Sequence, residues 1–384
     1  MKLLVVGLGS CGGRIADQFV RLGKKAKTER GIDFLVDAFA IDTDAVALDA
    51  LDTVRPDTDH RIVIGGTKAS GGGLSRINEL GAEIAREEGG RIIGILRRSP
   101  SFADTDAFLL AAATAGGTGS GTIAVLTRLL KESYPEKPVY GLAVLPFERE
   151  ELSERRADYN TGTCLKSLYV VADAILLVDN EKYLRKEPAV QANLEIVNIA
   201  VVGSLYNLLC ASEERKPRFI GSNMVRTGDM VHTLSGWTAL GSGKVPSRGP
   251  MSAGQARSGT AERSMHAMSE AMNELSVDCN PADCRRALCL ITAPSSMINI
   301  QTFKELGDSL RRAAPEAMIR TGDYPRDDRT VEVTIVLSEI VGLSRPIEYL
   351  DRAVDYVLAQ KRRKGINSTP RTPEEAIAEL PLLL

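Results

Sequence analysis

The chain has 384 residues, 43% of them hydrophobic and 26% charged, and its 48 basic and 50 acidic side chains leave a net charge of -2. This balance argues against the basic surface of a nucleic-acid-binding protein. No apolar run reaches the roughly 18 residues of a spanning helix, which argues against an integral membrane protein. Six cysteines without a disulfide or zinc pattern, and only three histidines, argue against a secreted scaffold, a metal cluster and His-dependent catalysis. We expect a cytoplasmic protein.

The first 180 residues alternate apolar runs with amphipathic stretches. We interpret the apolar runs as strands at Leu3–Val6, Phe34–Ile41, Arg61–Ile64, Phe108–Ala113, Val139–Leu145 and Ala174–Val178. Helix-like stretches lie between them at Ile15–Leu22, Arg76–Glu87 and Ile123–Lys131. This alternation is typical of a parallel sheet with helices on both faces. Because ligands of such sheets bind outside the carboxyl ends of the strands, the loops after the runs are the informative ones.

Three of these loops are rich in glycine. They are Gly7–Gly13 after the first run, Gly65–Gly73 after the third, and Ala115–Gly121 after the fourth, which reads A-G-G-T-G-S-G. Uncovered backbone N–H groups at a helix N-terminus attract anions, so three such loops on one sheet edge predict a cradle for a polyphosphate. The loop at Ala115–Gly121 lacks the Lys of a G-x-x-x-x-G-K-[S/T] phosphate loop. Amides, hydroxyls and a metal ion would have to hold the phosphate.

The rest of the chain predicts a central helix and a second domain. The apolar stretch Ala189–Ala211 after Pro188 is typical of a buried helix. We expect a Gly/Ser/Pro-rich loop at 241–259, then helices at Ala261–Leu275 and Phe303–Ala313 and strands at Arg286–Thr292, Ala317–Thr321 and Thr330–Leu337. A helix at Ile347–Arg363 precedes a polar tail with an apolar end at Pro381–Leu384. We expect the tail to be mobile; the alternative is that its apolar end docks on another surface. The predicted divisions are residues 1–187, 188–211, 212–345 and 346–384.

One interpretation of the first loop is a dinucleotide site. Gly7, Gly9 and Gly12 form a G-x-G-x-x-G pattern after a strand, and Asp42 ends the second strand as a ribose-binding acid would. These features alone favour an NAD-dependent oxidoreductase or synthase. That hypothesis leaves Gly71–Gly73 and Ala115–Gly121 without a role, and the scarcity of His removes the commonest proton-transfer group. It remains the alternative.

The sequence A-G-G-T-G-S-G closely resembles the G-G-G-T-G-[S/T]-G signature of the tubulin/FtsZ superfamily, with Ala115 in place of the first Gly. The loop at Gly7–Gly13 resembles the first phosphate loop of that family, and Asp42–Ala45 resembles its N-T-D-A loop. Tyr159–Thr161 and Asp179–Glu181 are more similar to tubulin than to bacterial FtsZ, and the combination most resembles the archaeal CetZ group over residues 1–340. The resemblance implies an α/β fold: a parallel-sheet GTPase domain with helices on both faces, a long central helix, and a second, smaller α+β domain.

The resemblance also implies GTP or GDP across the strand ends and assigns residues to each part of the nucleotide. The phosphates would contact Gly9, Ser10, Cys11, the closing loop Gly71, Gly72 and Gly73, and the helix start Gly116, Gly117, Thr118, Gly119 and Ser120. Asp42 and Asp44 would hold Mg²⁺, since hard cations prefer oxygen ligands. Glu151 and Arg155 would serve the ribose, and Asn180 and Asn193 would read the guanine base.

Hydrolysis in this family depends on acids from the next subunit of a head-to-tail homopolymer. The N-x-D-x-x-D motif of the family is degraded here to Asn223–Asp229. We expect Asn223 and Asp229 to be the catalytic pair, with Asp229 polarising the water and Glu213 and Glu214 in reserve. The implied function is GTP-dependent assembly into protofilaments in cell shape or division, with membrane-tethering or regulatory proteins as candidate partners of the tail. A GTP-binding regulatory protein that does not polymerise remains a further alternative.

Overall fold

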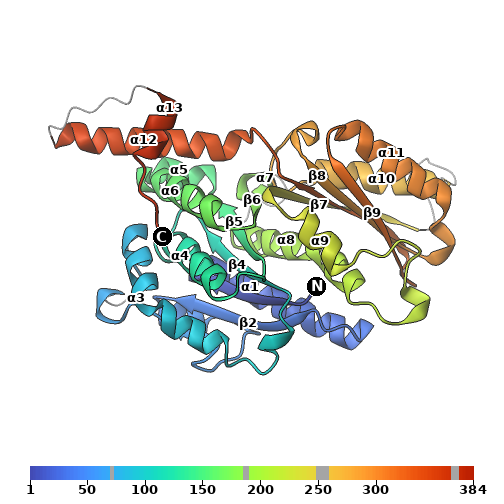
Figure 1. The fold of residues 1–384 in the computed structure, drawn as a ribbon, viewed down its shortest axis with the longest axis horizontal. Helices are drawn as coiled ribbons and strands as arrows, with labels where there is room; N and C mark the ends of the chain where they lie inside the picture. Colours follow the sequence, from blue (N-terminus) through green and yellow to red (C-terminus); the bar gives the residue numbers. More distant parts are fainter. Residues whose placement is uncertain (70–72, 185–189, 248–258, 365–371) are drawn as a thin grey trace. The chain divides into compact units, whose positions relative to one another are not determined.

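The structure is a computed structural model that describes residues 1–69, 73–184, 190–247, 259–364 and 372–384. The chain forms two compact units (Figure 1). The N-terminal unit comprises Leu3–Arg21, Leu35–Asn198 and Leu343–Leu384, and the C-terminal unit comprises Met1–Lys2, Leu22–Phe34 and Ile199–Gly342. No helix within these described ranges has the length and apolar character needed to cross a membrane.

The N-terminal unit contains a sheet of parallel strands in the order β3-β2-β1-β4-β5-β6. The strands are β1 Leu3–Leu8, β2 Leu35–Asp42, β3 Arg61–Val63, β4 Ala107–Ala113, β5 Val139–Leu145 and β6 Ala174–Asp179. Every residue of β1, β5 and β6 is buried. This two-sided burial explains why the strands read as unbroken apolar runs, and all six predicted strands are confirmed.

Helices cover both faces of this sheet. They are α1 Gly9–Lys25, α2 Ala45–Asp49, α3 Asn78–Leu96, α4 Thr118–Ser133, α5 Glu148–Ser153, α6 Arg155–Val171, α7 Asn180–Leu184, α12 Ser344–Arg363 and α13 Pro373–Ala378. Right-handed crossovers in opposite directions from β1 place α1 and α2 on one face and α3, α4 and α6 on the other. Helix α12 runs along α6 (Figure 1). The predicted fold class is therefore confirmed for this unit.

The C-terminal unit is the predicted α+β domain. Its strands have the order β7-β10-β8-β9, with β10 antiparallel to β7 and β8, and β8 parallel to β9. The strands are β7 Gly236–Pro246, β8 Arg286–Ala293, β9 Met318–Pro325 and β10 Thr330–Ser338, and the helices are α9 Thr227–Thr233, α10 Thr260–Asn273 and α11 Ile300–Ala313. The long helix α8, Val190–Ser212, is the predicted central helix; its residues to Asn198 belong to the N-terminal unit.

The prediction of a loop from residue 241 was wrong for its first part, because β7 continues to Pro246. Glycines signal a loop in sequence, but Gly241 and Gly243 lie here where the backbone of α10 approaches the strand. A Cβ at Gly241 would lie 2.1 Å from the carbonyl oxygen of Ala271, and one at Gly243 would lie 2.1 Å from that of Ala267. Close helix-strand contact therefore requires these glycines. Residues 248–258 lie outside the described part of the chain.

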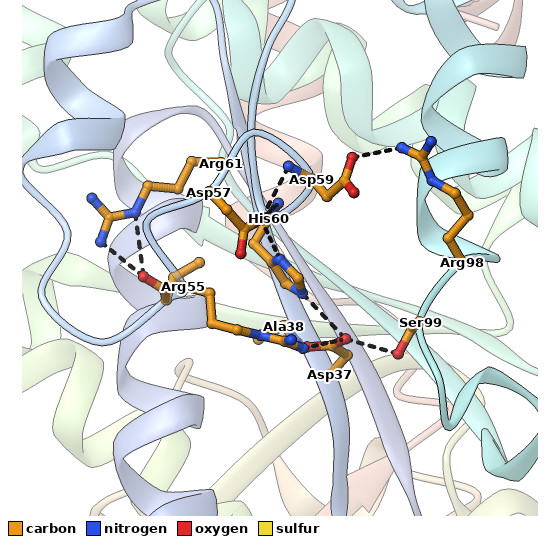
Figure 2. A network of polar contacts seen from close by, with 10 residues as sticks. Asp37, Ala38, Arg55, Asp57, Asp59, His60, Arg61, Arg98 and Ser99 are labelled. Atoms are coloured by element: carbon orange, nitrogen blue, oxygen red, sulfur yellow. Dashed lines mark hydrogen bonds and ion pairs between the residues drawn. The ribbon is translucent and has the colours of Figure 1, made fainter.

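A polar cluster surrounds Asp37 near the start of β2 (Figure 2). Arg55 Nη2 donates to both carboxylate oxygens of Asp37 at 2.8 Å, and Ser99 Oγ donates to Oδ2 at 2.7 Å. The His60 ring lies between two acids, with Nδ1 2.6 Å from Asp57 Oδ1 and Nε2 3.4 Å from Asp37 Oδ2. Because Asp37 precedes the carboxyl end of its strand by five residues, this cluster ties loops to the sheet away from the edge where ligands bind.

Candidate functional site

Two adjoining cavities lie at the carboxyl ends of the strands of the N-terminal unit. The first, of about 410 Å³, is lined by Leu8–Cys11, Asp42, Asp44, Gly73–Arg76, Ala113, Ala115–Gly119 and Glu150. The second, of about 230 Å³, is lined by Ser10, Cys11, Arg14, Ala113, Ala115, Val144–Phe147, Glu150 and Asn180. Five residues line both, so the cavities form one continuous depression. The structure thus brings most of the predicted site residues together.

The first and fourth loops contact each other through their backbones. Gly9 has a φ of +70°, which L side chains rarely adopt, and a Cβ built on it would lie 3.1 Å from the Gly119 nitrogen. A Cβ at Gly119 would lie 2.7 Å from the Leu8 carbonyl oxygen. Glycine at both positions therefore allows the starts of α1 and α4 to meet at the cavity. Two helix N-termini that face one cavity provide N–H groups and a positive dipole end for an anion.

The hydroxyls of the loop at Ala115–Gly121, the signature loop, already have hydrogen-bond partners inside the protein. Thr118 Oγ1 lies 2.8 Å from Thr43 Oγ1, and both side chains are buried. The Ser120 hydroxyl donates to the Gly116 carbonyl oxygen and is fully buried. Gly116, Gly117, Thr118 and Gly119 line the first cavity, whereas Ser120 supports the loop from behind.

Asp42 and Asp44 are the acids of the first cavity. Asp42 Oδ2 accepts from Ser10 Oγ at 3.0 Å and Oδ1 accepts from the Thr43 amide at 2.7 Å. Burial raises the pKa of the Asp42 carboxyl, opposed by these hydrogen bonds. Asp44 caps α2, with Oδ1 accepting from the Val46 amide at 2.9 Å.

Asp42 and Asp44 suit a Mg²⁺ ion that also binds substrate phosphates, rather than a metal ion that is held by protein ligands alone. Among the described residues, no group of three or more His, Cys, Asp or Glu is placed to hold a metal. Mg²⁺ is commonly bound by one or two carboxylates together with substrate phosphates, and Asp42 and Asp44 line one cavity with the signature loop. A cation there would also relieve the cost of ionising the buried Asp42.

Asn160 of α6 holds two loops of the cavity, a role that the sequence analysis did not assign. Its Nδ2 donates to the carbonyl oxygens of Arg76 at 2.8 Å, Ala115 at 3.0 Å and Gly116 at 2.9 Å. The side chain is completely buried. Asn78, the first residue of α3, donates to Thr163 Oγ1 one turn further along α6 at 2.9 Å. The only signal in sequence was the tubulin-like segment at 159–161.

The loop that leads into α3 has an unusual backbone. Ser75 and Arg76 have φ angles of 48° and 59°, in the left-handed region that non-glycine residues rarely occupy. Both residues line the first cavity together with Gly73. Such conformations cost on the order of 1–3 kcal/mol and are concentrated at ligand sites. Gly71 and Gly72, predicted to close over a γ-phosphate, lie outside the described residues.

The second cavity is lined by two polar side chains, those of Asn180 and Arg14, in addition to the residues that it shares with the first. Asn180 is 6% exposed, and its Oδ1 accepts no hydrogen bond from the part of the chain that the structure describes. An unpaired buried carbonyl costs free energy, which a ligand N–H would recover. Arg14 of α1, not predicted, lines the same cavity and adds a cationic donor. Burial raises the pKa of the Cys11 thiol to about 12, so Cys11 is a neutral wall of the pocket.

The residues predicted for the ribose and for the second base contact could not be located in the site. The side chains of Glu151, Arg155 and Asn193 lie outside the described residues. Glu150, one position earlier than the predicted acid, lines both cavities. The backbone of α5 starts after Phe147, which places Glu150 in the first turn facing the cavities.

Asn223 and Asp229 lie in the C-terminal unit. Asn223 is fixed against β9: its amide donates to Asp323 Oδ1 at 2.6 Å, and its side chain donates to the Thr321 carbonyl oxygen. Asp229 lies in the first turn of α9, where Oδ2 accepts from the Arg226 amide at 2.9 Å and Oδ1 lies 3.4 Å from Arg320 Nε. Its carboxylate is 38% exposed and therefore reachable by solvent.

The two reserve acids have structural partners instead. Glu214 has a side chain only 2% exposed and accepts from Tyr324 Oη at 3.0 Å and Arg326 Nη1 at 3.2 Å. Glu213 Oε1 lies 2.5 Å from the Met1 ammonium nitrogen. Both carboxylates are committed to the interior of the C-terminal unit, which leaves Asp229 as the accessible acid among the three.

Comparison with known proteins identifies the family. A model described as the GTPase domain of the tubulin/FtsZ family matches residues 2–186, and one described as the C-terminal domain of tubulin-like CetZ matches residues 187–355. The chain therefore belongs to the tubulin/FtsZ family. Within that family it belongs with the tubulin-like CetZ proteins, as its C-terminal match indicates.

Individual relatives agree with this assignment. Tubulin-like protein CetZ3 of Haloferax volcanii is 28% identical over 369 residues, which cover 92% of this chain and 92% of the relative. The structure of CetZ1 from Haloferax volcanii, a GDP-bound monomer, has a TM-score of 0.79 at 26% identity and covers 93% of this chain and 100% of that chain. CetZ2 from Haloferax volcanii, a GTPγS-bound protofilament, has a TM-score of 0.80 at 24% identity, covering 94% and 100%, and this likeness concerns the fold.

Proposed function

We propose that this protein binds GTP in the cavity of its N-terminal unit, assembles head to tail with further copies of itself, and hydrolyses GTP to GDP during that assembly. The observation that carries the proposal is the continuous depression with glycine-rich loops at one end and, at the other, the buried Asn180 Oδ1, which has no hydrogen-bond partner among the described residues. Guanine presents N–H donors at N1 and N2, which an amide oxygen can accept. Adenine has its N–H donors only at N6 and an acceptor at N1, so an amide oxygen that faces the N1 and N2 edge of guanine would meet no donor on adenine, and we expect weaker binding of ATP.

The phosphate end is built for a triphosphate with Mg²⁺. The N-termini of α1 and α4 supply backbone donors. Asp42 and Asp44 would hold Mg²⁺, which when bound neutralises charge on the phosphate oxygens. The NAD alternative would use Asp42 for a ribose but would leave the loop at Ala115–Gly121, which lines the same cavity, without a role. GDP-bound and GTPγS-bound structures of CetZ relatives support the assignment.

Hydrolysis needs an acid to orient the attacking water, and in this proposal Asp42 and Asp44 of the cavity are occupied with Mg²⁺. Asp229 is exposed to solvent in the C-terminal unit, where a neighbouring subunit would present it to the nucleotide. There its carboxylate orients the attacking water and accepts a proton from it. A heterologous contact of this kind, repeated without closing, makes a filament. The GTPγS-bound protofilament of the CetZ2 relative supports assembly. A cytoplasmic role in cell shape or division is part of the same proposal.

Nucleotide choice is tested by equilibrium binding. A fluorescent GTP analogue is titrated into the protein with Mg²⁺ and then competed with GTP, GDP, ATP and NAD. We expect GTP and GDP to displace it and ATP and NAD to be at least tenfold weaker. Displacement by NAD at the same concentration as GTP would overturn the proposal and restore the dehydrogenase alternative.

Assembly is tested by right-angle light scattering and phosphate release at several protein concentrations. If the acid comes from a neighbouring subunit, the rate per subunit rises with protein concentration. We expect Asp229→Ala to reduce phosphate release at least tenfold while GTP still binds. Asp327→Ala, at an exposed acid of the same unit paired with Arg218, is the matched control. Binding without scattering at any concentration would favour the regulatory protein that does not polymerise.

A further inference from the structure

The segment after α12 packs against other helices of the N-terminal unit, to which it belongs. Helix α13 precedes Leu380 and Leu383, which are 2% and 3% exposed, whereas Leu382 between them is 46% exposed. Leu383 packs with Ala82 and Ala85 of α3 and Val125 of α4. The chain end lies beside α4 in Figure 1. The prediction of a mobile tail is therefore wrong for residues 372–384, because its apolar end packs on other helices of its own unit.

Polar contacts fix the backbone of this segment. Lys166 Nζ of α6 donates to the carbonyl oxygens of Ile377 at 2.8 Å and Leu380 at 2.6 Å. The Leu383 amide donates to Ser167 Oγ at 2.8 Å, a buried hydrogen bond. Arg86 Nη1 of α3 donates to the Leu384 carbonyl oxygen at 2.8 Å. Side chains of α3 and α6 thus bind the segment as they would bind a peptide ligand.

The helices that hold this segment also hold the loops of the cavity. Helices α3 and α4 begin at the cavity loops, and Asn160 of α6 donates to both loops. Tyr159 packs against Leu380 and donates through its hydroxyl to Glu79 at 2.8 Å, in the first turn of α3. One side of α6 therefore contacts the docked segment while neighbouring residues position the cavity loops.

We propose that residues 380–384 are an intramolecular peptide ligand of the surface formed by α3, α4 and α6, and that docking of this segment and nucleotide binding stabilise each other. The coupling rests on the proposed GTP site, whereas the docking does not. Because both ligands favour the same arrangement of α3, α4 and α6, each strengthens the binding of the other by the same factor. This surface of α3, α4 and α6 is accordingly regulatory. Any protein that binds the segment in place of the surface lowers the affinity for nucleotide.

The test compares Leu383→Asp with Leu382→Asp in the full chain. Both substitutions add a charge to the same segment, but only Leu383 is buried, against α3 and α4. Hydrogen exchange of residues 372–384 and affinity for a fluorescent GTP analogue are measured for each. We expect Leu383→Asp to abolish protection of the segment and weaken nucleotide binding by about fivefold, while Leu382→Asp changes neither. In the wild type, GTP should slow exchange in the segment.

A rescue experiment separates undocking from misfolding. A synthetic peptide of residues 372–384 added to the Leu383→Asp protein should restore nucleotide affinity, and the same peptide carrying L383D should not. Equal exchange in the two variants would overturn docking. Lost protection with unchanged affinity, or no rescue, would overturn the coupling. If the wild type binds no guanine nucleotide, the proposed function and the coupling fail together, and the exchange comparison still decides docking.

Discussion

The side-chain nitrogen of Asn160 lies 2.9 Å from the carbonyl oxygen of Gly116, and through that hydrogen bond α6 holds the loop from which α4 starts. The same nitrogen reaches the Arg76 carbonyl oxygen at 2.8 Å, on the loop from which α3 starts. One amide group therefore sets the spacing of two loops around the cavity. This makes Asn160 a positioning residue for whatever the cavity binds.

Replacement of Asn160 by Leu should weaken nucleotide binding by about tenfold and lower the free energy of unfolding by about 2 kcal/mol, because buried carbonyl groups lose their donor. Titration of a fluorescent GTP analogue and urea unfolding measure the two effects. Asn299→Ala is the control, since it removes the N-cap of α11 in the other unit at a cost of about 1 kcal/mol. Equal affinity in the two variants would show that Asn160 serves stability alone.

The glycines of the signature loop should differ sharply in their tolerance of a methyl group. A Cβ at Gly119 would lie 2.7 Å from the Leu8 carbonyl oxygen, whereas none of the surrounding atoms lies within 4 Å of a Cβ at Gly116. Gly119→Ala should therefore cost about 3 kcal/mol of unfolding free energy, and Gly116→Ala should leave it unchanged. Urea titration of both variants without nucleotide checks this. Comparable losses would mean that the two helix starts do not meet as described.

Asn180→Ala should reduce GTP affinity by about tenfold, the effect of one lost hydrogen bond of 1.4 kcal/mol, and should reduce the preference for GTP over ATP. Competition titrations measure both. Tripolyphosphate, which has no base, serves as the internal control and should compete equally well against the variant and the wild type. If tripolyphosphate binding also falls, Asn180 acts through the phosphate loops rather than on the base.

Asp42→Asn should stabilise the nucleotide-free protein at neutral pH. Burial raises the folded-state pKa of this carboxyl above 3.8, so its ionisation opposes folding. That penalty is complete above the folded pKa, diminishes as the pH falls through it, and disappears below 3.8. Thermal midpoints from pH 3.5 to 7.5 should show the advantage of the variant only at the upper end.

The same substitution should cost function, because it removes a carboxylate from the proposed Mg²⁺ site. GTP affinity of Asp42→Asn should respond less to added Mg²⁺ than that of the wild type. Asp44→Asn is the matched control for stability, since Asn caps a helix as well as Asp does. A variant that is less stable than the wild type at pH 7.5 would contradict the role of burial at Asp42.

The sequence pattern predicted the parallel sheet because strands that are covered on both faces appear as nearly continuous apolar runs. Runs this short indicate strands rather than buried helices. The prediction failed where the role of a residue depends on packing against an element distant in sequence rather than on its own helix or strand. Gly241 and Gly243 signal a turn locally, yet they accommodate the backbone of α10. Leu380 and Leu383 lie in a short polar tail, and only packing against other helices makes them core residues: Leu383 packs on α3 and α4, and Leu380 on α6 and α12.

The candidate site was likewise predicted only in part from the sequence. Motif spacing placed Asp42, Asp44 and the signature loop, since these residues contact the cavity directly from strand ends. Asn160 and Arg14 were missed because their roles depend on how α6 and α1 lie against loops distant in sequence. Glu150 of α5 lines both cavities and was not predicted, whereas Glu151, the predicted acid, stays a prediction because its side chain lies outside the described residues.

The buried contact between Thr43 and Thr118 has two equivalent forms, since either hydroxyl can be the donor across the 2.8 Å between the oxygens. A phosphate oxygen that accepts from Thr118 would remove this choice: Thr118 must turn its proton toward the ligand, and Thr43 must then donate to Thr118. Binding of a phosphate in the cavity would thus fix the direction of the Thr43 O–H bond, directly after β2. Such a reversal moves no heavy atom, so the loop after β2 could sense the nucleotide without any change of backbone.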